Sequence, residues 1–123
     1  MFSTSQTIKT YTTEKVNVDE SAIIDSISKC IGIDEREISI DYDNWDFNTD
    51  DIELSSYFSG MIIIFIKEKI SDEAKVKLQE WLDTDIKNDT TVHDCELTES
   101  NYPSGYPMIH IWFKYPFNKE WSE

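Results

Sequence analysis

The feature that most constrains the fold of this chain is a run of six apolar residues at positions 61–66, Met-Ile-Ile-Ile-Phe-Ile. A strand with one face in water alternates apolar and polar side chains, whereas a run without alternation is typical of a strand covered on both faces. Six residues are also far fewer than the roughly 20 needed to cross a bilayer. We therefore expect residues 52–66 to form a long strand or strand pair that ends as the central strand of a sheet, with Gly60 as a candidate bulge.

Shorter alternating stretches predict further strands. Residues 7–12 are rich in β-branched side chains, and residues 37–42 place Ile38, Ile40 and Tyr42 on one face. Residues 90–98 and 106–115 predict a hairpin, because the segment 99–105 between them contains Pro and Gly.

The last predicted strand has two different faces. One alternation suits a core and consists of Ile109, Ile111, Phe113 and Tyr115. The other alternation consists of Tyr106, Met108, His110 and Trp112. It would face outward unless the added strand or the C-terminal residues 116–123, which include Phe117 and Trp121, fold across it. Exposed residues of these types are enriched at the centres of protein interfaces.

Local end signals predict two helices. Asp19 is a good N-cap for the first helix, and Gly32 supplies a left-handed C-cap at its other end. Ser71 caps the second helix, whose first turn carries acidic residues that suit the helix dipole. The apolar positions recur at helical spacing, namely Ile23, Ile24, Ile27 and Ile31 in the first helix and Ala74, Leu78, Trp81, Leu82 and Ile86 in the second.

The predicted order of elements is β-α-β-β-α-β-β, and 123 residues suit one domain. This order predicts an α+β fold, in which an antiparallel sheet of about five strands carries two helices on one face. It corresponds to a ferredoxin-like variant with an added strand, spanning residues 1–123 as a single acidic domain.

Negative charge is concentrated in the middle of the chain. Residues 34–53 hold nine carboxylates and a single cation, Arg36. The carboxylates are Asp34, Glu35, Glu37, Asp41, Asp43, Asp46, Asp50, Asp51 and Glu53. Each close pair costs about 1 kcal/mol of repulsion even in water, so the density suggests a use. We expect residues 43–51 to form an acidic loop that also carries Trp45 and Phe47.

The whole chain is acidic, with 25 acidic and 11 basic residues and a net charge of −14. Phosphate backbones and anionic lipids would repel such a surface, so we expect neither direct nucleic-acid binding nor membrane binding. A basic protein is the expected partner. The residues expected to bind it are Glu37, Asp41, Asp43, Trp45, Asp46, Asp50, Asp51, Tyr106, His110 and Trp112.

The sequence also offers two possible metal sites, and neither is favoured. Residues 46–50 fit the first ligand positions of an EF-hand, but Asp51 stands where Gly is required and Tyr57 where Glu is required. His93, Cys95 and His110 could share a metal if they met on one face of the hairpin. We expect no cofactor and no metal.

The cysteines and the N-terminus bear on location. Cys30 and Cys95 are too few for a disulfide framework, and two free thiols are favoured over a single bridge. The first residues, Met-Phe-Ser-Thr-Ser-Gln-Thr, lack the basic start and apolar run of a secretory signal. A cytoplasmic location is therefore expected.

In size, charge and composition the whole chain resembles bacterial immunity proteins that neutralise nuclease toxins, and equally phage-encoded DNA mimics that block restriction or CRISPR nucleases. No diagnostic motif carries the resemblance, so no site residue follows from it. It implies a stoichiometric inhibitor, monomeric when free, that docks on the basic groove of a nuclease toxin or a defence nuclease. We favour the immunity role, because its cognate toxins are small basic nucleases.

Two other classes stay open. One is a subunit of an oligomeric assembly whose outward aromatic residues form the seam between copies. The other is a small enzyme that uses Cys95, His93 or paired carboxylates. The chain lacks a glycine-rich phosphate loop and a nucleophile elbow, so we expect a binding protein rather than an enzyme.

Overall fold

The protein has a mixed α+β fold, seen in a computed structural model that describes residues 1–8, 12–50, 55–89, 91–101 and 104–114. The elements in chain order are β1 (Phe2–Ile8), β2 (Thr12–Val18), α1 (Glu20–Ile31), the short 3-10 helix η1 (Glu35–Glu37), β3 (Ile38–Asp50), β4 (Ser55–Ile66), α2 (Asp72–Trp81), the π-helical turn η2 (Leu82–Ile86), β5 (Val92–Asn101) and β6 (Ser104–Lys114). Within these ranges, neither helix has the length and apolar content that a membrane span requires.

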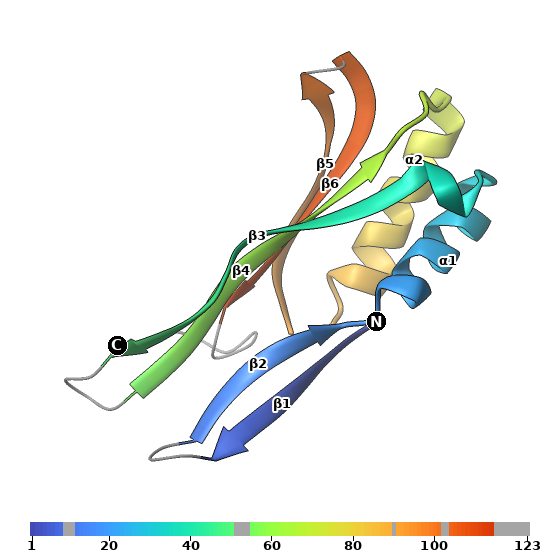
Figure 1. Cartoon of the computed structure of the whole chain (residues 1–123). Helices are drawn as coiled ribbons and strands as arrows, with labels where there is room; N and C mark the ends of the chain where they lie inside the picture. The colour runs from blue at the N-terminus through green and yellow to red at the C-terminus, as the bar shows by residue number, and fades with distance from the viewer. Residues whose placement is uncertain (9–11, 51–54, 90, 102–103, 115–123) are drawn as a thin grey trace.

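The strands form two antiparallel sheets instead of the expected sheet of about five strands. β1 and β2 pair as a separate hairpin, and the larger sheet has the order β3-β4-β6-β5 (Figure 1). The ferredoxin-like arrangement is therefore not seen. The prediction that β4 is a central strand is confirmed, because β4 pairs with β3 on one side and with β6 on the other.

The predicted number of strands before α1 was wrong. A single strand was expected at residues 7–12, but that stretch includes the end of β1 and the start of β2. The two strands pair in continuous register from Phe2 opposite Val18 to Ile8 opposite Thr12, and residues 9–11 lie outside the described part.

Both predicted helices are confirmed with their end signals. The Asp19 carboxylate accepts a hydrogen bond from the Ala22 backbone N–H at 3.1 Å, and Gly32 ends α1 in the left-handed conformation with φ 71°. A residue with a side chain would be strained at that φ, so glycine suits the position. Ser71 caps α2 in the same way, with its hydroxyl 3.1 Å from the Ala74 backbone nitrogen.

The core lies between one face of the larger sheet and α1, α2 and the β1–β2 hairpin. The sheet contributes Ile62, Ile64 and Ile66 from β4, and Ile109, Ile111 and Phe113 from β6. The helical side contributes Ile23, Ile27, Leu78, Trp81, Leu82 and Ile86. The hairpin reaches the same cluster, because the ring of Phe2 meets the ring of Phe113 edge-on with centroids 5.0 Å apart.

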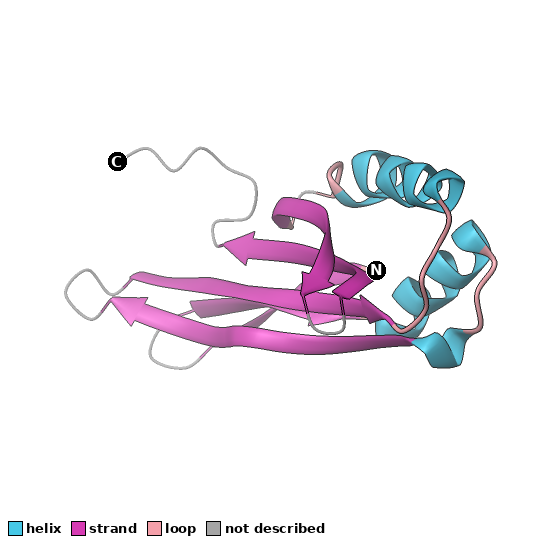
Figure 2. Ribbon diagram, turned by 90° about the horizontal axis from the view of Figure 1, so that it is seen from above, coloured by secondary structure: helices cyan, strands magenta, loops and turns pink. Residues whose placement is uncertain are grey.

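The covering elements occupy different parts of this core face. The helices gather at one end of the long strands, and the hairpin lies beside the other part of the sheet (Figures 1 and 2). The residues that the structure describes therefore cover one face of β4. The expectation that both faces of residues 61–66 are covered is not met by the described residues, and residues 115–123 lie outside them.

The prediction of an acidic loop at residues 43–51 was also wrong, because β3 continues to Asp50. Its pairing with β4 shifts by one residue between Asp43 and Asp46, so Asn44 and Trp45 form a bulge opposite Gly60. A bulge was expected at Gly60 itself, and the extra residue lies instead on the neighbouring strand.

The C-terminal hairpin is confirmed, but its strands run further than expected. β5 and β6 pair up to Asn101 opposite Ser104, so most of the predicted turn at 99–105 belongs to the strands. Gly105 has φ 86°, a conformation that favours glycine. Tyr115 lies outside the described residues.

Candidate functional site

The candidate site is the second face of the larger sheet, which we call the open face. The pairing register arranges it in three rows across β3, β4, β6 and β5, namely Asp43, Met61, Trp112 and Asp94, then Asp41, Ile63, His110 and Glu96, then Ser39, Phe65, Met108 and Thr98. No apolar residue of these rows belongs to the described core cluster or to the side chains packed against it. This face is therefore distinct from the core face.

The middle of the open face is apolar and aromatic. We call it the central strip, and it consists of Met61, Ile63 and Phe65 from β4 and Met108, His110 and Trp112 from β6. All six are half-buried. A contiguous patch of large apolar side chains at the surface commonly marks an interaction site.

Carboxylates stand on both sides of the central strip. We call them the acidic margins, Asp41 and Asp43 on β3 and Asp94 and Glu96 on β5, and all four are exposed. β3 and β5 are the outer strands of the sheet, separated by three strand spacings of about 4.8 Å each, so the margins lie about 14 Å apart.

The carboxylates of the acidic margins are not neutralised by cations among the described residues. Among the described residues, none of the four carboxylates forms an ion pair. Two lysines of the segment that leads to β5 pair with other carboxylates. Lys75 bridges to Glu99 at 2.8 Å, which raises the pKa of Lys75 and lowers that of Glu99, and Lys87 pairs with Asp83 at 3.3 Å.

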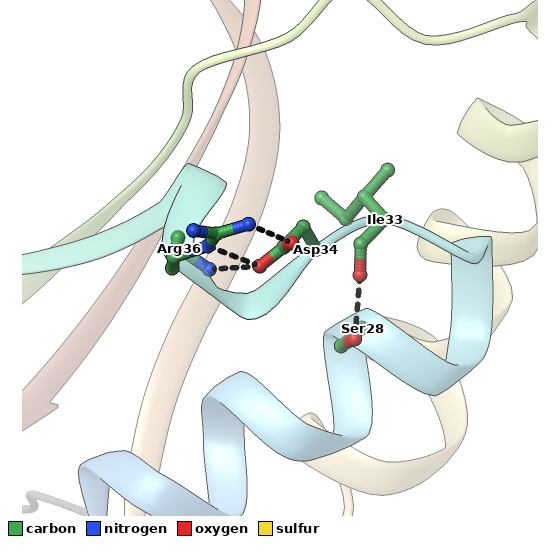
Figure 3. Close-up of polar contacts among 4 residues, drawn as sticks. All are labelled: Ser28, Ile33, Asp34 and Arg36. Carbon is green, nitrogen blue, oxygen red and sulfur yellow. Dashed lines mark hydrogen bonds and ion pairs between the residues drawn. The ribbon is translucent and has the colours of Figure 1, made fainter.

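The single arginine is also occupied (Figure 3). Its guanidinium donates two bonds to the Asp34 carboxylate, from Nε to Oδ1 at 3.2 Å and from Nη2 to Oδ2 at 3.0 Å. The Arg36 backbone N–H donates to Asp34 as well, at 2.9 Å. These bonds lower the pKa of the Asp34 carboxyl, and the Asp34 carboxylate raises the pKa of Arg36. The one arginine in the acidic segment is therefore paired at the start of the segment, before β3 begins.

His110 adds an unusual polar group to the central strip. Its ring stacks on the Trp112 ring, with centroids 5.5 Å apart and planes 19° apart. Its Nδ1 is buried and has no hydrogen-bond partner among the described residues. A buried polar atom without a partner commonly costs about 1–3 kcal/mol, so a ligand that bonds to this nitrogen would regain part of that cost.

The structure separates the ten residues predicted to bind a partner. It places Asp41, Asp43, His110 and Trp112 on the open face. Tyr106 shares their alternation on β6 but lies beyond the part of β6 that pairs with β4. Glu37 ends η1 and is half-buried instead of standing on a strand.

The remaining four predicted residues are described only in part. Trp45 lies in the bulge of β3, and the register sets Asp46 opposite Ser59 and Asp50 opposite Ser55. Their side chains are outside the described part, and Asp51 lies outside the described residues altogether.

Six residues of the central strip and the acidic margins were missing from the predicted site. One of them, Met108, was placed in the outward row of the last predicted strand but not among the partner-binding residues. Met61, Ile63 and Phe65 were expected to be buried, and Asp94 and Glu96 were counted only as part of the general acidity. The signal that could have found them is alternation, because His110 and Trp112 share a parity that their neighbours on β4 and β5 continue. That signal becomes usable only when the strand order is known.

The metal interpretations are not supported. Cys95 is buried on the core face opposite Ile111, whereas His110 lies on the open face, so the two cannot share a metal. Residues 46–50 belong to a paired strand and not to a calcium-binding loop. In the described ranges, no group of three or more His, Cys, Asp or Glu side chains could hold a metal ion.

Both cysteines are free. Cys30 is half-buried on α1, with its Sγ 3.5 Å from the Lys77 carbonyl oxygen, and Cys95 is buried on β5. Burial raises the pKa of both thiols, which lowers their thiolate fraction at neutral pH. Neither environment favours a nucleophilic cysteine.

No protein-family model, curated protein or solved structure matches the chain.

Proposed function

We propose that this protein is an inhibitor that binds a basic nucleic-acid-acting enzyme through the open face, and that the enzyme is a nuclease toxin. The observation that carries the proposal is an apolar central strip with exposed carboxylates on both sides of it, none of which forms an ion pair with another described residue. The net charge of −14 adds a long-range attraction toward any cationic groove.

The two parts of the face would contribute differently to binding. Complementary charge speeds the encounter and selects the partner, raising association rates toward about 10⁸ M⁻¹s⁻¹ or more at low salt. Buried aromatic and apolar side chains supply most of the affinity and slow dissociation. An inhibitor of a toxic enzyme needs both properties, since it must bind fast and stay bound.

A second copy of this chain is a less suitable occupant. If two copies stacked their central strips, the acidic margins of one would meet those of the other, whichever way the copies were turned. Like charges held in contact cost free energy and discourage association. This supports a protein that is monomeric in the absence of its basic partner.

A DNA mimic for a restriction or CRISPR nuclease shares the acidic character but not the central strip. Phosphate backbones offer no exposed apolar band of this kind, so a mimic would gain little from Met61, Ile63 or Trp112. The central strip therefore favours an immunity-type inhibitor over a charge mimic.

The proposal is tested by inhibition assays. Purified protein is titrated against basic DNase and RNase toxin domains from the same host, and separately against restriction and CRISPR nucleases. We expect stoichiometric inhibition of one toxin nuclease. Inhibition of defence nucleases alone would favour the mimic, and no inhibition of any of these enzymes would overturn the proposal.

Two matched variants assign the effect to the open face. The margin variant combines Asp41→Asn, Asp43→Asn, Asp94→Asn and Glu96→Gln. The Asn at 94 keeps an oxygen that can accept the Cys95 N–H bond, now 2.8 Å long. The control variant combines Glu35→Gln, Glu68→Gln, Glu73→Gln and Glu80→Gln, which removes four exposed charges away from this face. Only the margin variant should associate more slowly and inhibit more weakly.

A further inference from the structure

We infer that the element of the partner that occupies the open face is an amphipathic α-helix with lysine or arginine along both borders of its apolar stripe. The inference rests on the proposed function, because it names the recognition element of the same site. It is drawn from the width, length and charge pattern of the face.

The width of the face suits a helix. The acidic margins lie about 14 Å apart across the strands, and an α-helix with its side chains is about 10–12 Å across. A helix lying along β4 and β6 would cover the central strip. Its flanking side chains would then reach Asp41 and Asp43 on one side and Asp94 and Glu96 on the other.

A single extended strand suits the face less well. Successive side chains of a strand point to opposite sides, so one face of it carries one row of residues. Such a row can be apolar and match the central strip, or basic and match a margin, but it cannot do both on two sides. A helix presents three adjacent rows at once, with an apolar stripe between two polar borders.

The length of the face sets the size of the helix. From Met61 to Phe65 the central strip extends about 13 Å along β4, at about 3.3 Å per residue. At about 1.5 Å per residue, a helix crosses that length in about nine residues. Apolar anchors at positions i, i+3 or i+4, and i+7 would contact all three rows.

The core face shows how the same sheet accommodates helices. In its middle row, Ile40 and Leu97 flank the central pair Ile64 and Ile109, and the apolar sides of α1 and α2 contribute to this cluster. In the corresponding row of the open face, Asp41 and Glu96 replace these apolar flanks. The two faces therefore demand helices that differ at their borders, apolar on the core face and cationic on the open face.

The inference is tested with synthetic peptides and isotope-labelled protein. The probe is a stapled peptide of about 18 residues, long enough to hold a helix, with leucine anchors and lysine along both borders. One control has the same residues in strict apolar–basic alternation, and a second keeps the helical pattern but carries glutamate in place of lysine. Binding is measured by calorimetry and mapped by backbone and Trp112 indole NMR shifts.

We expect the lysine helix to bind at least about tenfold more tightly than either control and to shift resonances of the open face. The margin variant should weaken this binding about tenfold, and the four-charge control variant should not. Equal or tighter binding of the alternating peptide would overturn the inference. So would shifts confined to the core face or the β1–β2 hairpin, or no binding by any peptide.

Failure of the inference and failure of the proposed function are distinguishable. If a toxin nuclease is inhibited but the helical peptide has no advantage, the inhibitor role stands and the helical element is excluded. If the helical peptide binds the open face but no nuclease is inhibited, the face accepts a basic helix that belongs to another class of partner.

Discussion

The two faces of the four-stranded sheet are made by alternate residues of the same strands, yet their surroundings differ completely. Ile62, Ile64 and Ile66 are at most 1% exposed beneath the helices and the hairpin, whereas Met61, Ile63 and Phe65 on the other face remain half-buried. Along β4 the two sets have the same apolar character. The outer strands make the difference. In the middle row they contribute Ile40 and Leu97 to the core face but Asp41 and Glu96 to the open face, and the neighbouring open-face row adds Asp43 and Asp94. The side chains of the outer strands β3 and β5 therefore distinguish the two faces.

The difference in burial between the two faces of β4 can be measured at two neighbouring isoleucines, Ile63 and Ile64. Ile64→Ala should cost about 2–5 kcal/mol of unfolding free energy, because Ile64 is fully buried and its loss leaves a cavity. Ile63→Ala should cost about 1 kcal/mol or less, because water can occupy the space. Urea denaturation of both variants measures the difference. Equal losses would show that the open face is covered in the free protein.

The helices could be predicted from the sequence, because their signals are local. Asp19 and Gly32 mark the two ends of α1, Ser71 marks the start of α2, and the apolar stripes repeat within a few residues. No distant part of the chain is needed to interpret them. Four of the five predicted apolar positions of the second helix are confirmed as core for the same reason, namely Leu78, Trp81, Leu82 and Ile86, whereas Ala74 is only half-buried.

The strands were wrongly predicted where pairing with another strand outweighs the preference of the local residue types. The β1–β2 hairpin was missed because alternation runs through residues 7–12 without glycine, proline or asparagine to mark a turn. Residues 43–50 were expected to be a loop because they are rich in Asp and Asn, but pairing with β4 holds them in a strand. A one-residue bulge accommodates the change in alternation.

The candidate site could be predicted only in part. Asp41, Asp43, His110 and Trp112 were identified from charge and alternation within single strands. Their assembly with Ile63 and Glu96 depends on the order β3-β4-β6-β5, which no local pattern contains. A uniform apolar run likewise gives no information on which of its faces is covered.

The second prediction tests whether the open face is dedicated to binding. Trp112→Ala should weaken binding of the inhibited nuclease by about 30-fold, equivalent to about 2 kcal/mol, since central aromatic residues dominate interface energetics. Calorimetric titration measures the loss. Val76→Ala, which truncates an apolar side chain 58% exposed on α2, should leave affinity unchanged and serves as the control.

The third prediction separates charge from apolar contact. Asp43→Lys should slow association with the basic partner by up to about tenfold at low salt, because it reverses one charge of the acidic margins. At 1 M salt, where the Debye length is about 3 Å, the difference should largely disappear. Stopped-flow measurements at several salt concentrations test this. Glu80→Lys on α2 makes the same charge change elsewhere, and an equal effect there would contradict a site-specific role.

The smallest effect is expected where the core face ends, at Tyr42. Its hydroxyl donates to Glu20 Oε2 at 2.6 Å, and desolvation together with this bond raises the pKa of Tyr42 to about 12. Because the folded protein holds the proton more tightly than the unfolded chain, whose pKa is near 10, the contribution is complete below pH 10. It is lost as the pH rises through about 12.

Tyr42→Phe should remove this part of the alkaline dependence. The comparison is the difference in urea midpoint between wild type and variant, followed from about pH 9 to pH 12. We expect the difference to shrink as Tyr42 ionises in the wild type. A constant difference over this range would show that the Tyr42–Glu20 bond does not couple folding to the phenol proton.

The position of the acidic margins on β3 and β5 has one more consequence, for behaviour in concentrated solution. These are the outer strands, and outer strands offer backbone groups that can recruit further chains into extended aggregates. Charged side chains along such strands hold neighbouring molecules apart. The carboxylates would thus oppose aggregation of a sheet that has apolar side chains on both faces. Neutralising them should lower the concentration at which the protein precipitates.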